Sequence, residues 1–439
     1  MSGKEITIAG GGPAGLAVAH YASQRGIPFE LFEAGHKVGG NCSTFKKNAF
    51  YYDSGAHRLH DKHPETTSIF KELLGSDLQK IEVPSQIYRD GQFIDFPLSP
   101  LNLLRFLGAQ RFGKAAGQII KNKLLTKEQP LDFQALAEKS YGHTIAELFL
   151  LEYTEKLWGL PSKELSTEVA GKRLKGLDLK TFIIETFKNS ESKTEHLDGS
   201  FYYPKLGIGT LFEKLAENSK GSIHLNSPIT KIHHESGRLN SISFGQETHE
   251  VSQLVNSLPL GLTLKLLNPK PPQEILQLAS DIKFRNVILF VLFLDKSSVN
   301  GNGSMYFPDG KYPFTRVYEP RNRSRDMAPN GKTSLIAEVP CQKQDSIWTN
   351  PKGLSEKIKE QLMQIGFFKE SELLDMDIQK LGHAYPILEV NYQSKIKPIF
   401  EYLNSFQNLY LTGRNGLFAY SHIHDHMQNG KRIVDELKF

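Results

Sequence analysis

Three glycines near the start of the chain have the spacing of a turn that binds a dinucleotide. Gly10, Gly12 and Gly15 follow the apolar, β-branched run 5–9, which predicts a short buried strand. In such a pattern Gly10 permits a tight turn, Gly12 lets the backbone approach a pyrophosphate, and Gly15 lets the next helix pack on the strand. The phosphates would then lie at the N-terminus of that helix, where free N–H groups and the helix dipole favour an anion.

A carboxylate stands where such a fold holds a ribose. After the expected helix, a turn at Gly26 and Pro28 leads to a second apolar run, 29–32, which ends at Glu33. A carboxylate at this place can accept hydrogen bonds from a ribose hydroxyl. A glycine-rich surface turn is the alternative interpretation, but strand, spacing and acid together favour a nucleotide site.

A second glycine pair, Gly39 and Gly40, follows the acidic strand end. With the segments GGGPAGL at 10–16, FEAGHKVGGN at 32–41 and LYLTGR at 409–414, the chain resembles the FAD-binding flavoproteins of the amine oxidase, protoporphyrinogen oxidase and UDP-galactopyranose mutase group. The resemblance implies FAD, expected to be non-covalent because the C-terminal region has no cysteine to link it. It implies cofactor contacts from Gly10, Gly12, Pro13, Ala14, Gly15, Glu33, Ala34, Gly39, Gly40, Asn41, His57, Ile229, Gly413, Arg414 and Met427.

The resemblance also implies an α/β fold. A discontinuous Rossmann-like FAD-binding domain, built on a βαβ dinucleotide fold, would carry inserted helical and antiparallel-sheet substrate domains. The 439 residues suffice for two or three cores. The predicted parts are 1–84 (FAD-binding), 85–203 (mostly helical substrate domain), 204–262 (FAD-binding), 263–381 (antiparallel-sheet substrate domain) and 382–439 (FAD-binding).

Individual strands can be assigned within this plan. The run 222–225 is expected to extend the parallel sheet. The runs 229–233, 239–244 and 253–255 are expected to form a small antiparallel meander. The run 286–294 is apolar on both faces, which predicts a central strand of a second sheet.

Composition limits the possible partners. A net charge of +5 fits an anionic cofactor or substrate and lacks the clustered charge of a nucleic-acid binder. Cys42 and Cys341 are too few for a disulfide framework and lack metal-ligand spacing. No apolar run approaches twenty residues, and the first strand leaves no room for a signal peptide. The sequence therefore predicts a cytoplasmic protein with neither a metal nor a nucleic-acid partner.

The stretch 101–127 carries six basic residues and no acid, interleaved with apolar residues at helical spacing. Such a helix pair could lie on an anionic membrane surface or line a groove for an anionic substrate. We expect it to belong to a helical domain with a basic solvated face. Peripheral membrane contact stays possible but is not favoured.

The motifs YTEKLWG at 153–159 and KRL at 172–174 are similar to the mutase branch of the group. There the tryptophan and the arginine face a sugar nucleotide, which implies such a role for Trp158 and Arg173. An indole supplies a flat apolar wall, and a guanidinium makes a bidentate contact with phosphate or carboxylate. Without the resemblance, Trp158 would be read as core and Arg173 as a surface charge.

Further site residues follow from the same resemblance. Arg316 would bind a pyrophosphate opposite Arg173, so that the two guanidiniums converge on one anionic group. Tyr385 and Tyr420 would face the substrate. His57, in a turn after an expected hairpin at 45–52, would lie at the flavin face, although a histidine in a turn is more often structural.

Two departures from the resembled proteins bear on the reaction. Flavin amine oxidases usually carry a lysine near the strand 286–294, whereas Arg285 and Asn286 stand there in this chain. The segment where mutases hold uridine with tyrosine and glutamine reads Asp-Phe-Pro-Leu-Ser at 95–99. The sequence favours a FAD-dependent oxidoreductase, protoporphyrinogen oxidase-like or amine oxidase-like, acting on a small anionic organic substrate. The alternatives are a mutase that isomerises a sugar nucleotide through reduced FAD and a flavin-binding scaffold.

Overall fold

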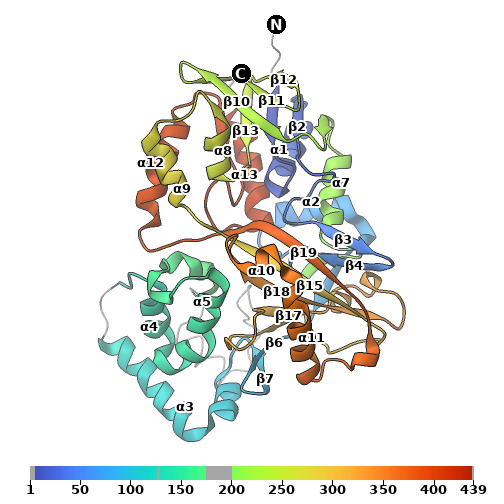
Figure 1. The fold of residues 1–439 in the computed structure, drawn as a ribbon, viewed down its shortest axis with the longest axis vertical. Helices are drawn as coiled ribbons and strands as arrows, with labels where there is room; N and C mark the ends of the chain where they lie inside the picture. The colour runs from blue at the N-terminus through green and yellow to red at the C-terminus, as the bar shows by residue number, and fades with distance from the viewer. Residues whose placement is uncertain (1–4, 126–128, 175–199, 438–439) are drawn as a thin grey trace.

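A five-stranded parallel sheet forms the centre of the domain that contains both chain ends (Figure 1). The computed structural model describes residues 5–125, 129–174 and 200–437. In spatial order the strands are β20 (Leu409–Leu411), β13 (Gln253–Asn256), β1 (Ile6–Ala9), β2 (Phe29–Phe32) and β9 (Ser222–His224). All neighbouring pairs are parallel, and the apolar residues of β1 are fully buried. The order confirms the predicted βαβ fold.

Helices cover this sheet and join its separate chain segments. They are α1 (Pro13–Gln24), α2 (Pro64–Leu74), α7 (Gly209–Glu217) and α13 (Ile423–Glu436). The helices α1 and α13 pack so closely that a Cβ added at Gly430 would lie 2.8 Å from the Cβ of Ala17. The C-terminal segment, which also supplies β20, thus packs with the parallel sheet.

A small antiparallel meander flanks the parallel sheet. Its strands are β10 (Ile229–Glu235), β11 (Arg238–Phe244) and β12 (Glu247–Glu250), with β14 (Leu267–Asn268) parallel to β10. The helices α8 (Leu260–Leu266), α9 (Gln273–Asp281) and α12 (Tyr392–Asn404) pack beside it. The expectation that 253–255 joins the meander was wrong, since β13 pairs with β1 and β20 and is buried along its whole length. A run of four residues, Gln-Leu-Val-Asn, is too short for its periodicity to separate the two cases.

A seven-stranded sheet forms the second large layer. In spatial order its strands are β19 (Leu373–Pro386), β15 (Phe284–Leu294), β18 (Thr333–Cys341), β17 (Arg316–Tyr318), β16 (Ser304–Tyr306), β6 (Ser85–Arg89) and β7 (Gln92–Phe96). The long apolar strand β15 lies between two antiparallel partners, as its sequence predicts. The hairpin β6–β7, within the range 85–203, completes this sheet through the parallel pair β6–β16. The helices α10 (Ser346–Thr349) and α11 (Ser355–Gln364) pack against the sheet.

Helices make up the rest of the range up to residue 174. They are α3 (Pro100–Leu125), α4 (Phe133–Ala146), the π-helix η2 (Glu147–Leu151), α5 (Glu152–Trp158) and the 3₁₀ helices η3 (Ser162–Glu164) and η4 (Thr167–Leu174). Gly108 breaks α3 with a φ of +73°. Leu103, Leu107 and Ile119 of α3 pack in a core with Phe149, so α3 is an integral part of the fold, as expected.

Short elements complete the chain. They are the hairpin β3 (Thr44–Lys47) and β4 (Phe50–Asp53), the pair β5 (Leu78–Glu82) and β8 (Ser200–Pro204), and the 3₁₀ helices η1 (Gly75–Asp77), η5 (Pro320–Asn322), η6 (Arg325–Met327), η7 (Pro351–Leu354) and η8 (Glu370–Glu372). Within the described ranges, none of the helices combines the length and the apolar character needed to span a bilayer.

Candidate active site

The first glycine loop has the geometry of a phosphate-binding turn. Gly10 has a φ of +98°, a backbone conformation that favours glycine. A Cβ at Gly15 would lie 2.0 Å from the carbonyl oxygen of Gly10, so only glycine allows α1 to start this close to β1. Gly12 precedes α1, which has neither a side-chain cap nor an acidic residue in its first turn. The first N–H groups of α1 therefore lack side-chain acceptors, as an anion site at a helix N-terminus requires.

The second glycine loop lies against the first. The Gly39 N–H donates to the Gly11 carbonyl at 2.9 Å. A Cβ at Gly40 would lie 3.2 Å from the Cα of Gly12, and Gly40 has a φ of +50°. The structure thus brings the segments 10–15 and 39–41 together at the N-terminus of α1, which is the arrangement expected around a pyrophosphate.

A third segment reaches the same place from the other end of the chain. Gly413 has a φ of +82°, and a Cβ there would lie 3.3 Å from the Cβ of Ala14. Asn41 donates from its side chain to the carbonyl of His383 at 3.3 Å, and Asn415 donates to the same oxygen at 2.8 Å. Loops from both ends of the chain therefore meet beside Pro13, the first residue of α1.

Glu33 is oriented by the backbone. Its two carboxylate oxygens accept the N–H groups of Gly11 and Gly35, each at 2.7 Å. The next residue, Ala34, is exposed. The N–H of Ser227 donates to the carbonyl of Glu33 at 2.9 Å, which places the start of β10, and with it Ile229, near the acidic strand end. The uncapped helix, the glycine loops and this carboxylate fit the pyrophosphate and ribose of a dinucleotide such as FAD.

His57 is half-buried among positive charges. Burial, reinforced by the charges of Arg414 and Arg316, lowers the pKa of its imidazole to about 3. Its Nδ1 lies 3.8 Å from the Cys42 sulfur, and burial raises the pKa of that thiol to about 12. The pair is therefore a neutral imidazole beside a neutral thiol. The buried Nε2 of His57 has no hydrogen-bond partner within the described residues.

Three predicted aromatic residues form one cluster. The ring centroids of Trp158 and Tyr385 are 5.9 Å apart, and those of Trp158 and Tyr420 are 6.3 Å apart. Tyr385 and Tyr420 stack at 6.1 Å with an angle of 25° between their planes. They come from α5, from the end of β19 and from the loop before α13, so only the tertiary fold joins them.

Arg414 completes this cluster. Its guanidinium carbon lies 5.4 Å from the ring centroid of Tyr385 and 5.0 Å from that of Tyr420. Its nitrogens donate to the carbonyl oxygens of Ala384 at 3.2 Å and of Ser421 at 2.7 Å. Within the described chain it forms no ion pair with a carboxylate. Arg414 thus holds the two tyrosine segments together and brings a charge without a carboxylate partner in the described chain to the aromatic cluster.

Arg316 already has an anionic partner, which the sequence reasoning missed. Its Nε and its terminal nitrogen donate to the two carboxylate oxygens of Glu338 at 2.9 and 2.8 Å. Glu338 is buried and also accepts the N–H of Ala56 at 3.1 Å, next to His57. Its signal in the sequence is a single acid in the apolar strand 333–341. Burial and the charge of Glu338 raise the pKa of Tyr385, which keeps that phenol protonated.

For two predicted residues the described structure gives no contact with the rest of the candidate site. The Arg173 side chain lies outside the described part of the chain, although its backbone belongs to η4. The convergence of Arg173 and Arg316 on one anion therefore remains a prediction. Met427 is 1% exposed and packs in the core that includes α1 and α13, so its expected cofactor contact also remains a prediction.

At the position where flavin amine oxidases usually carry a lysine, this chain has Arg285 and Asn286, whose side chains bind backbone groups of neighbouring segments. Arg285 is buried and donates to the carbonyls of Lys156 and Leu157, each at 3.1 Å, at the end of α5. Asn286 accepts the N–H of His383 at 3.0 Å. Both side chains support the segments that carry Trp158 and Tyr385.

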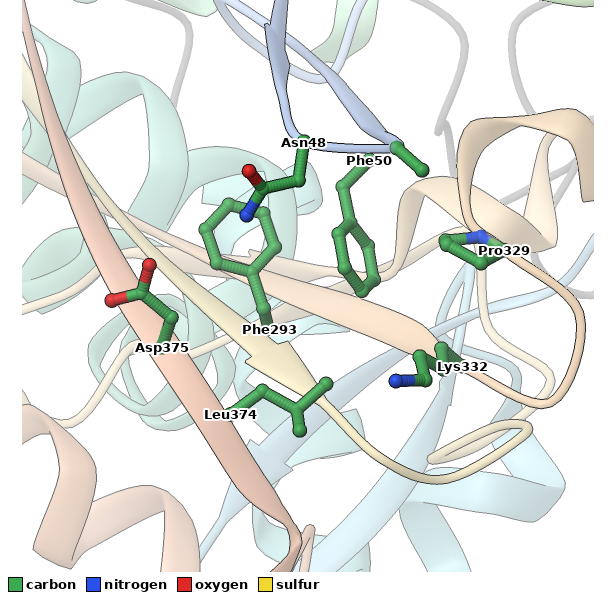
Figure 2. A pocket seen from close by; sticks show the side chains of 8 residues that line it. Asn48, Phe50, Phe293, Pro329, Lys332, Leu374 and Asp375 are labelled. Carbon is green, nitrogen blue, oxygen red and sulfur yellow. The ribbon is translucent and has the colours of Figure 1, made fainter.

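A hollow elsewhere in the protein is separate from these residues. Figure 2 shows its two phenylalanines, Phe50 and Phe293, with Lys332 and Asp375 at the sides. It has a volume of about 430 Å³ and lies between the β3–β4 turn and the edge formed by β15 and β19. No predicted site residue lines it.

The parallel sheet, the glycine loops and the separate seven-stranded sheet are the architecture of a dinucleotide-binding flavoprotein. The profile of the family described as flavin containing amine oxidoreductase matches residues 13–377. The chain belongs to this family. Its members are flavoenzymes, so the protein is an enzyme with a flavin cofactor, typically FAD.

Individual relatives show how broad the group is. A coproporphyrinogen III oxidase of Bacillus subtilis (strain 168) is 22% identical over 99% of this chain and 97% of its own length. Protoporphyrinogen oxidase 2 of Arabidopsis thaliana is 30% identical, but the match covers only 24% of this chain and 21% of the relative. The structure of reduced UDP-galactopyranose mutase superposes with a TM-score of 0.86 at 19% identity, covering 99% of this chain and 94% of that one. At this identity the likeness shows the fold alone.

Proposed function

We propose that the protein is a FAD-dependent oxidoreductase acting on a small anionic organic substrate, with FAD held non-covalently. The observation that carries this proposal is Arg414. Its guanidinium lies over both stacked tyrosines, whose rings would otherwise be able to attract a cationic amine. An ammonium group would be repelled there, whereas a carboxylate or phosphate would be attracted.

The chain's own residues can be assigned roles in this proposal. The N-terminus of α1 and the glycine loops hold the pyrophosphate, and Glu33 holds the ribose. When bound, FAD would supply the capacity to accept a hydride from the organic substrate and to pass the electrons to a second acceptor. Trp158 and Tyr385 wall the substrate, and the protonated phenol of Tyr385 can donate a hydrogen bond to it. His57 stays neutral at ordinary pH, so it contributes a polar group and no charge.

A mutase acting through reduced FAD is the second candidate. The observation that favours it is the contact of Trp158, Tyr385 and Tyr420, the aromatic set that the mutase resemblance implies. Against it stands the segment 95–99, which lacks the tyrosine and the glutamine expected to hold uridine.

One experiment separates the candidates. The FAD-loaded protein is incubated in air with coproporphyrinogen III, a polycarboxylate named in its full-length relative, and with putrescine, while flavin reduction and product are followed. In parallel the anaerobically reduced protein is incubated with UDP-galactopyranose. We expect oxidation of the anionic compound or a related one and none of the amine. Turnover of UDP-galactopyranose by the reduced protein alone would replace the oxidoreductase with the mutase.

A further inference from the structure

Large apolar side chains that remain exposed are concentrated in one part of the protein. Of the ten such residues in the described chain, six lie between positions 93 and 131. They are Phe93, Phe96, Leu101, Leu104, Ile120 and Leu131. Scattered exposed apolar residues are normal, but a concentration marks an interaction surface.

The first half of α3 presents such residues on its outer face. Leu101 is 57% exposed and Leu104 is 38% exposed, and Arg105 follows at the next helical step. Leu103 and Leu107 point the other way and are buried. The spacing of three and four residues puts the exposed set on one face of the helix.

The second half of α3, after the break at Gly108, continues this pattern. Lys114 and Lys121 are exposed, and Ile120 is 52% exposed, whereas Ala115 and Ile119 are buried. Here the outward face is mainly basic, with one large aliphatic side chain among the cations.

The charge of this face is of one sign. Arg105, Arg111, Lys114 and Lys121 are all exposed, and α3 contains no acidic residue. Within the described residues none of the four forms an ion pair. The helix lies at the end of the protein opposite the parallel sheet and the chain termini (Figure 1). A flat partner could therefore approach α3 without meeting the FAD-type domain.

We propose that the outer face of α3, together with Phe96 at the end of β7, docks on an anionic lipid bilayer. Cations beside exposed leucine and isoleucine are complementary to a membrane surface. Anionic headgroups attract the cations, and the aliphatic side chains insert at the boundary between headgroups and acyl chains. Aliphatic chains gain little from a nucleic acid, which is bound through phosphates and base stacking. The apolar exposure distinguishes this face from the solvated basic face that the sequence favoured.

The test is vesicle flotation of the FAD-loaded full chain at low salt. Vesicles of phosphatidylcholine are compared with vesicles of phosphatidylcholine and phosphatidylglycerol in equal parts. We expect binding to the anionic vesicles only, weakened as salt rises, since the Debye length falls to about 10 Å at 0.1 M. Replacing Arg105, Arg111, Lys114 and Lys121 by glutamine should lower the partition coefficient about fivefold per cation.

The apolar half of the proposal has its own matched control. The combined variant Leu101→Ser, Leu104→Ser and Ile120→Ser should lower the partition coefficient at least about tenfold, because the inserted side chains are lost. The control Leu225→Ser, Leu262→Ser and Leu374→Ser removes exposed leucines elsewhere and should leave it unchanged. Absence of wild-type binding at low salt would overturn the proposal, as would an equal loss in the control or no loss in the α3 variant.

Discussion

The two sides of the candidate active site are built in different ways. The cofactor side is made mainly by backbone: Gly12 and Gly40 approach each other, and α1 offers its uncapped N-terminus. The substrate side is made by side chains from distant segments, among them Trp158, Tyr385 and Arg414. A backbone site depends on glycine spacing and is shared across a family. A side-chain site depends on tertiary packing and can change between relatives with the same fold.

Charge differs between the two sides as well. On the cofactor side the only carboxylate we assign a role is Glu33, and backbone N–H groups fix it. On the substrate side the charge of Arg316 is balanced by Glu338, whereas Arg414 has carbonyl partners. The cofactor side is therefore complementary to a single ligand, the dinucleotide. On the substrate side the Arg414 guanidinium remains available to a second, anionic ligand.

The largest effect should come from breaking the Arg316–Glu338 pair on the substrate side. Glu338→Gln leaves the Arg316 guanidinium, whose side chain is only 18% exposed, without its counter-ion, which should lower the free energy of unfolding by about 3 kcal/mol. Urea denaturation at saturating FAD measures this loss. Added pyrophosphate should restore more stability in the variant than in the wild type, since it can replace the lost carboxylate.

A surface ion pair provides the control for this variant. Asp375→Asn removes a half-exposed partner of Lys47, and the expected loss is at most about 1 kcal/mol. Equal losses in the two variants would show that the Arg316–Glu338 pair is no more important than a surface contact.

The next effect concerns pH and the start of α13, which follows the tyrosine loop. Burial lowers the pKa of His424 and His426 to about 4, below the ordinary value of 6.5. Each imidazole is therefore neutral in the folded protein, while the unfolded chain takes up the proton. The contribution of these histidines to the free energy of unfolding should be complete above about pH 6.5. It should be lost as pH drops toward 4, by up to about 3 kcal/mol per histidine.

Denaturation curves across this pH range check the sign. His424→Gln should flatten the decline, because one proton uptake on unfolding is removed. A decline of unchanged steepness in the His424 variant would contradict the assignment.

A smaller effect is expected on the cofactor side. Glu33→Ala should weaken FAD binding by about 1.5–3 kcal/mol, the contribution of a charged hydrogen bond. Equilibrium dialysis or flavin fluorescence measures the change. The matched control is Glu30→Ala on β2, the strand that precedes Glu33, where the carboxylate contacts His224 at 3.0 Å. Unchanged affinity in the Glu33 variant would show that this residue does not hold the ribose.

The strands and glycine loops of the cofactor side could be predicted because their determinants are local, whereas the FAD contacts themselves remain a prediction. Glycine spacing, the acid after β2 and the apolar strands are short-range features, so they can be recognised in the sequence without knowledge of the fold. The strand β13 was misplaced because a strand of four residues, of which only Leu254 and Val255 are apolar, carries no information on its neighbours. Even there the error concerned pairing, since the strand itself was expected.

The substrate side was harder to predict because its charges are paired across the fold. Resemblance gave Arg316 as an anion ligand, and the structure shows that a strand partner from 22 residues away already holds it. Likewise nothing around Arg285 indicated that its guanidinium would cap α5. Such pairings depend on side-chain directions that spacing alone does not fix.

The most direct test of the substrate side is a titration of the flavin absorbance of the FAD-saturated protein. Pyrophosphate and succinate are compared with putrescine, in the wild type and in Arg414→Gln. We expect a saturable spectral shift with the anions, about tenfold weaker in the variant, because a charged hydrogen bond is lost. Putrescine should cause no shift. A shift or flavin reduction by putrescine, with no response to either anion, would contradict the account.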